Sequence, residues 1–231
     1  VGVFLMPFYL MMNVPYHVAV DASLMAVFFS SLTSSIQHYK EGGLLLEPCV
    51  VMAVPGSICA IIGSFYLINT ISPVLLMIIF AGIMFLNADF FHFMKKKEIK
   101  TTDPGSINHL RYFPLYIVVG VTVGLSASLL GIGGGIIIVP CLMRVAHYPV
   151  KDAVKVAVFV MIFTTFFGFS ADLVRNSLPY YIGGSSAIGA IVGCFLGSIA
   201  LKYVRQALIT HVNYIVSLIL GVIMLLRAII Y

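Results

Sequence analysis

Charged residues are scarce in this 231-residue chain: they make up 9% of the sequence, whereas a soluble domain carries about 25%. Apolar residues make up 61%, and the mean hydropathy is +1.10. A soluble core cannot hide that much apolar surface, while a bilayer can. The scarcity of charge therefore excludes a soluble enzyme, a nucleic-acid-binding module and a disordered tail. It predicts an all-α, polytopic helical membrane protein.

The sequence also lacks the residue patterns of redox and metal sites. Its four cysteines lie in apolar runs without CxxC spacing, which favours small buried residues over disulfides or metal ligands. Its six histidines form no HxxxH or HExxH motif, so a metalloprotease is not supported. No nucleophile–base spacing occurs in the apolar runs either. We therefore expect no catalytic residue, no metal and no cofactor.

Seven apolar runs are long enough to cross a bilayer, which takes about 20 residues. The run from Val3 to Met12 is too short to cross alone, and no basic region or cleavage site of a signal peptide precedes it. We therefore expect the chain to begin partway through a membrane segment. The predicted crossings cover residues 18–36, 44–68, 73–94, 113–143, 152–171, 179–201 and 208–230.

One polar stretch, residues 95–111, interrupts the apolar runs and contains Pro104-Gly105, which is typical of a loop. Its five basic residues indicate a cytoplasmic location in a plasma-membrane protein. The predicted organisation is a first membrane repeat over 1–94, a linker over 95–111 and a second repeat over 112–231. Alternating crossings then put three basic residues on the linker side, Lys40, Arg175 and Arg227. Five fall on the opposite side: Arg144, Lys151, Lys155, Lys202 and Arg205.

The two halves of the sequence resemble each other. GVFLMP at 2–7 matches GIIIVP at 135–140 with an offset of 133, and PYHVAV at 15–20 matches PVKDAV at 149–154 with an offset of 134. This pattern predicts two homologous four-helix halves, with the first helix of the first half truncated. Four full crossings per half would make the halves parallel copies, whereas a re-entrant segment would change that parity. The sequence leaves both arrangements open.

The segment Gly131-Ile-Gly133-Gly134-Gly135 lies inside an apolar run that is too long for one straight helix. Each glycine destabilises a helix by about 1 kcal/mol relative to alanine, so we expect a break there. A new helix from Gly135 would direct N–H groups and its positive dipole end into a cavity, which favours an anion. The alternative role for small residues is close helix packing. We expect such packing along Ser185, Gly189, Gly193 and Gly197.

Other polar residues within the spans are candidates for the same site. The repeat pairs Ser30 and Ser31 with Thr164 and Thr165, whose hydroxyls can either donate to an oxyanion or bond their own helix carbonyls. Asp21 and Lys155 are also repeat mates. As an ion pair across the pseudo-symmetry axis they would gate or line the site. The alternative is that both lie near helix ends, where a lysine snorkels and an aspartate interacts with the first turn.

Together these motifs resemble the TauE/SafE-type permeases. The resemblance rests on GIGGGIIIVPCL followed by YPVKDAVKVAVFVMIFTT, and on the first-half echo GVFLMPFYLMMNVPYHVAVDASLMAVFFSSLTSSIQHY. That family is implicated in exporting sulfite and organosulfonates. The resemblance therefore implies a permease that moves a small sulfur oxyanion or sulfonate by alternating access between two related halves. It implies substrate-binding roles for Gly131, Gly133, Gly134, Gly135 and Pro140, and for Gly2 and Pro7.

The sequence departs from the family pattern at three positions. Val1 stands where a second glycine is expected, and Asp21 and Lys155 stand where the family has small or neutral residues. The expected partners are a small anion and the lipid bilayer, without nucleic acid. A coupling proton or sodium ion and a homo-oligomer are left open. The alternative functions are an anion channel and a non-transporting membrane scaffold, and substrate-saturable flux would distinguish a carrier from either.

Overall fold

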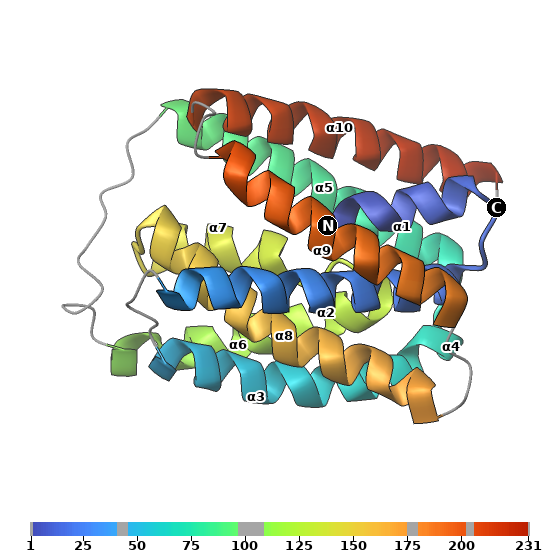
Figure 1. Cartoon of the computed structure of the whole chain (residues 1–231), viewed down its shortest axis with the longest axis horizontal. Helices are drawn as coiled ribbons and strands as arrows, with labels where there is room; N and C mark the ends of the chain where they lie inside the picture. Colours follow the sequence, from blue (N-terminus) through green and yellow to red (C-terminus); the bar gives the residue numbers. More distant parts are fainter. Residues whose placement is uncertain (1, 41–45, 97–108, 175–179, 202–205, 231) are drawn as a thin grey trace.

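The computed structural model describes residues 2–40, 46–96, 109–174, 180–201 and 206–230, and these residues form helices and no strands (Figure 1). The first half contains two long helices, three shorter ones and a π-helical turn that joins α3 to α4. The second half contains three long helices, α9 and the short α7. The bounds are α1 Gly2–Met11, α2 Tyr16–Lys40, α3 Leu46–Ile62, η1 Gly63–Leu67, α4 Ile68–Thr70, α5 Pro73–Lys96, α6 His109–Leu130, α7 Gly135–Val145, α8 Val150–Val174, α9 Tyr180–Leu201 and α10 Gln206–Ile230.

Six helical segments of the described chain are long and apolar enough to cross a bilayer. They confirm five of the predicted crossings closely and a sixth in part. In α9, the apolar stretch that the structure describes is shorter, Tyr181–Gly197. The six segments are Tyr16–Gln37, Leu46–Leu67, Pro73–Phe90, Tyr112–Leu130, Val150–Ser170 and Val212–Ile230.

The predicted crossing over residues 113–143 is wrong as a single element. α6 ends at Leu130, and α7 begins at Gly135 and runs back toward the end of the molecule at which α6 starts (Figure 1). As a result α2 and α8 run in opposite directions, and so do α5 and α10. Of the two arrangements that the sequence left open, the parallel copies are therefore not the one found. The re-entrant segment that the sequence left open is present.

This reversal changes the side on which the basic residues fall. The helix ends that flank the linker lie at the left of Figure 1, together with the end of α7, the start of α8, the end of α9 and the start of α10. Three residues that we expected opposite the linker, Arg144, Lys151 and Lys155, lie in the helices at this end. Lys202 and Arg205, which we also expected opposite the linker, lie outside the described residues.

The helices α3 and α6 pack backbone against backbone. A Cβ on Gly120 would lie 2.5 Å from the carbonyl oxygen of Met52, and a Cβ on Gly124 would overlap the carbonyl oxygen of Gly56. Only residues without side chains let two backbones approach this closely. The small-residue stripe that we expected to pack tightly, on α9, does not do so within the described chain. No atom lies within 4 Å of a Cβ built on Gly189, Gly193 or Gly197.

Two buried apolar clusters hold the bundle together, and each combines both halves of the sequence. The first joins α1, α2 and α5 to α10, with Phe80 and Met224 fully buried. The second joins α3 to α6, α7 and α8, with Met52 and Val160 fully buried. The predicted division into repeats stays a prediction, but the packing units do not follow it.

The turns that precede α2 and α8 each contain a non-glycine residue with a positive φ. Asn13 precedes α2 with φ 59°, and His147 precedes α8 with φ 56°. The guanidinium of Arg227 holds the first turn from α10, since its Nη2 donates to the Met11 carbonyl and to Asn13 Oδ1, both at 3.0 Å. In the turn before α8, Tyr148 is buried and its hydroxyl lies 3.2 Å from that of Tyr116. Burial raises the pKa of the Tyr148 phenol, which therefore stays neutral.

The α3–α6 contact yields a stability prediction. Gly124→Leu places a side chain against rigid backbone, so we expect a loss of about 3 kcal/mol of stability. Gly82→Leu is the matched control, because no atom lies within 4 Å of its Cβ position and leucine is the better helix former. Thermal unfolding in detergent measures both. A Gly124→Leu protein as stable as the Gly82→Leu protein would show that the helices do not pack this way.

Candidate functional site

The glycine segment breaks the helix as predicted. Gly131, Gly133 and Gly134 have φ values of 67°, 79° and 87°, in the left-handed region that glycine adopts without strain. Gly134 caps α7, and its carbonyl accepts the amide hydrogens of Ile137 and Ile138 at 2.9 and 3.1 Å. The four residues of the break are buried. The start of a helix is therefore placed inside the protein rather than at a membrane surface.

The start of α1 lies against this break. A Cβ on Gly2, the first residue of α1, would overlap the carbonyl oxygen of Gly131. The hydroxyl of Ser23, on α2, lies between the two segments, 2.6 Å from the Gly131 carbonyl oxygen and 3.3 Å from that of Gly2. The structure thus brings together the two glycine motifs, which are more than half the chain apart in sequence.

Sequence reasoning missed Ser23. The residue has no repeat partner of its own kind, since Ala157 stands at the matched position. Ser23 matters because the helix break removes the Gly131 carbonyl from regular helix bonding. A local sequence pattern does not reveal this. Ser23 is fully buried.

Apolar side chains surround the glycines. A Cβ on Gly133 would lie 2.5 Å from Cγ1 of Val27 and 3.1 Å from Cε of Met161. A Cβ on Gly135 would lie 2.7 Å from the Met161 sulfur. Val27 and Met161 are repeat mates, on α2 and α8. Beside these side chains, backbone N–H groups are the donors that the break can offer to an anion.

The predicted hydroxyl pairs mostly bond within their own helices. Ser30 donates to the Val27 carbonyl at 3.0 Å, and Thr164 and Thr165 donate to carbonyls one turn earlier at 3.1 and 2.6 Å. Thr165 has its methyl 3.5 Å from the Cβ position of Gly133, so it lies at the break. Thr164 instead contacts Gly56 of α3 with its methyl. Ser31 is buried, and the ligand role of all four residues stays a prediction.

Each short helix carries one of the predicted prolines. Pro7 and Pro140 are the sixth residues of α1 and α7. Proline has no N–H, so the carbonyls of Val3 and Ile136 lose the bond that a regular helix would give them. Both prolines therefore loosen backbone bonding near the glycines.

The predicted pair of Asp21 and Lys155 stays a prediction. Asp21, on α2, is buried with 4% of its surface exposed. Lys155 lies 3.5 Å from Asp152, one turn earlier on α8. Within the described residues no group of three or more His, Cys, Asp or Glu side chains is placed to hold a metal ion.

The link between the two glycine motifs can be tested through Ser23. Ser23→Ala leaves the buried carbonyl of Gly131 without its donor, which costs about 2 kcal/mol. Ser30→Ala is the control, because that hydroxyl bonds a carbonyl of its own helix. We expect thermal unfolding in detergent to fall by several degrees for Ser23→Ala and to change little for Ser30→Ala. Equal melting temperatures would argue against the Ser23 bridge.

Comparison with known proteins identifies the family of this chain. The family model described as "Sulfite exporter TauE/SafE" matches residues 1–225. The "Probable membrane transporter protein MJ0441" of Methanocaldococcus jannaschii is 30% identical over 88% of this chain and 76% of its own. The "Probable membrane transporter protein YdhB" of Bacillus subtilis is 22% identical over 94% of this chain and 87% of its own. No solved structure matches. The chain therefore belongs to the TauE/SafE family of membrane transporters.

Proposed function

We propose that this protein transports a small sulfur anion, such as sulfite or an organosulfonate, by alternating access between its two halves. The observation that carries the proposal is the meeting of Gly2 with the Gly131–Gly135 break inside the protein. Family membership supports the anion class, since the matching model bears the name of a sulfite exporter.

The chemistry of the break suits an anion. The first amides of a helix have no carbonyl one turn earlier, and the helix dipole adds partial positive charge at the same place. α1 and α7 both begin at glycine, so a ligand can approach the backbone without meeting a Cβ. Two such helix starts near one point would bind an oxyanion without a buried cation, which is costly to desolvate.

The inverted run of the two halves supports alternating access. Transporters built from inverted repeats hold substrate where broken helices meet, and they expose that point to each side in turn. Here α2 and α8 run in opposite directions, and each packs on one of the short helices that start at the glycines. A channel or a scaffold remains the alternative, and saturable flux distinguishes the carrier from both.

We also propose that the linker end of the molecule is cytoplasmic. Among the basic residues of the described helices, one lies at the opposite end, Arg227, and the others lie at the linker end: Lys40, Lys95, Lys96, Arg111, Arg144, Lys151 and Lys155. An excess of basic residues in short connections is typical of the cytoplasmic face. A location in the plasma membrane and coupling to a proton or sodium ion complete the proposal.

Flux measurements test the substrate site. We expect Gly133→Ala to abolish saturable uptake of labelled sulfite into proteoliposomes, because alanine at φ 79° is strained and its Cβ meets Val27. Gly135→Ala lacks that strain and faces a flexible methionine, so we expect a folded protein with a raised KM. Gly193→Ala, in open space, is the control and should keep normal flux. Unchanged kinetics in both Gly133→Ala and Gly135→Ala would refute the site.

Cysteine labelling tests the orientation. In a variant without the four native cysteines, Ser72→Cys lies between α4 and α5 on an exposed residue, at the end opposite the linker. Ser106→Cys lies within the linker sequence. A membrane-impermeant maleimide added to intact cells should label Ser72→Cys at once and Ser106→Cys only after permeabilisation. The reverse pattern would overturn the assignment.

A further inference from the structure

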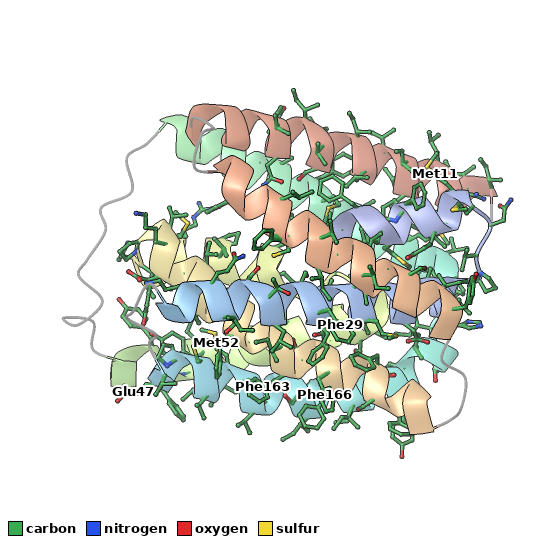
Figure 2. The ribbon with its side chains drawn as sticks, in the orientation of Figure 1. Met11, Phe29, Glu47, Met52, Phe163 and Phe166 are labelled. Atoms are coloured by element: carbon green, nitrogen blue, oxygen red, sulfur yellow. The ribbon has the colours of Figure 1, made fainter. Side chains whose placement is uncertain are left out.

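A groove lined almost entirely by apolar side chains runs between α3 and α8 on the outside of the bundle, away from the glycine break. Its volume is about 380 Å³. Figure 2 shows one of its aromatic side chains, Phe163, where α8 lies alongside α3. The other side chains that line it come from the same two helices: Val50, Ala53, Val54, Ser57, Ile58, Ile61, Phe159 and Phe167.

The groove has a small floor between large walls. Ala53 and Ser57 form the floor, one helical turn apart, and both are nearly inaccessible. Three phenylalanines, four residues apart on α8, form one wall. The row of three phenylalanines is specific to α8, because the repeat-matched positions on α2 are Met25, Phe29 and Thr33.

The length of the groove matches one leaflet. Val50 to Ile61 spans about 17 Å along a helix, and half of the hydrocarbon core is about 15 Å thick. Val50 lies one turn inside the span that begins at Leu46, at the linker end of the molecule. The groove is thus about as long as one hydrocarbon chain of a lipid in the leaflet on that side.

Charged residues of both signs stand at the open end of the groove. α3 and α8 run in the same direction, and Gly56 lies against Thr164, so Glu47 lies at about the level of Lys155. Lys155 and Lys151 precede the first groove phenylalanine on α8 by four and eight residues, which puts them on the same helix face. Glu47 and Lys151 are exposed. This arrangement complements a headgroup that carries both a phosphate and an amine.

We propose that this groove binds a membrane phospholipid with a zwitterionic headgroup. One hydrocarbon chain lies between α3 and α8, and the phosphate lies beside the first turns of α8. The binding does not depend on the transported substrate. The lipid contacts the face of α8 that carries Phe159, Phe163 and Phe167, while Met161 on the same helix reaches the glycine break.

Photolabelling tests the proposal. The protein is reconstituted in phosphatidylethanolamine vesicles that contain a trace of the same lipid with a photoactivatable diazirine at mid-chain. After irradiation, peptide mass spectrometry should find the label concentrated on 50–61 and 159–167. The exposed face of α10, which includes Ile215, Ile219 and Val222, gives the level for unspecific lipid contact. A diacylglycerol that carries the same diazirine but lacks the phosphate should label the groove several-fold less.

Two variants block the groove in different ways. Ser57→Leu fills the floor, and Val54→Trp covers the mouth from a residue that is 56% exposed and tolerates bulk. Both should reduce groove labelling several-fold at unchanged thermal stability, while Val222→Trp on α10 should not. Labelling equal to that of α10, or unchanged in both variants, would overturn the proposal. Crosslinks between two copies through α3 would overturn it in favour of a dimer contact.

Discussion

A peptide group inside a bilayer must find a hydrogen-bond partner within the protein, and this requirement governs the centre of the structure. The chain leaves helical geometry at Gly131, whose N–H still donates to the Ala127 carbonyl at 2.9 Å. Its own carbonyl accepts from Ser23, a residue of α2. Helical bonding resumes on the carbonyl of Gly134. The break is therefore stabilised by a contact from the first half of the sequence, and the amides at the start of α7 are the donors that remain for a ligand.

The reversal of direction at the break sets the topology of everything that follows. Because α7 returns to the side on which α6 began, every later helix runs opposite to its sequence counterpart. The basic ends of α7 and α8 therefore fall on the linker side. The same reversal lets α1 and α7 begin near one another, since a helix start can meet another start only when the two helices point apart. Charge distribution and site geometry are consequences of one backbone feature.

Features that depend on neighbouring residues could be predicted from the sequence, whereas contacts between distant segments could not. The sequence predicted the break at Gly131–Gly134, because the helix propensity of glycine is a local property. It did not predict that α7 turns back, because the hydropathy of a segment does not show toward which side of the membrane its chain runs. The small residues of α9 permit close approach but do not supply a partner, and within the described chain none lies against Gly189, Gly193 or Gly197. Ser23 was missed because its acceptor exists only in the folded protein.

The packing of α3 on α6 has a consequence for biosynthesis. Gly124 follows Gly56 by 68 residues, and α4, α5 and the basic linker are made in between. During that time the bare backbone of α3 faces lipid tails, which must be displaced when α6 arrives. Assembly of the bundle therefore cannot proceed helix by helix in the order of synthesis. The bundle can be completed only after α6 has been inserted, and until then α3 spans the membrane without its principal neighbour.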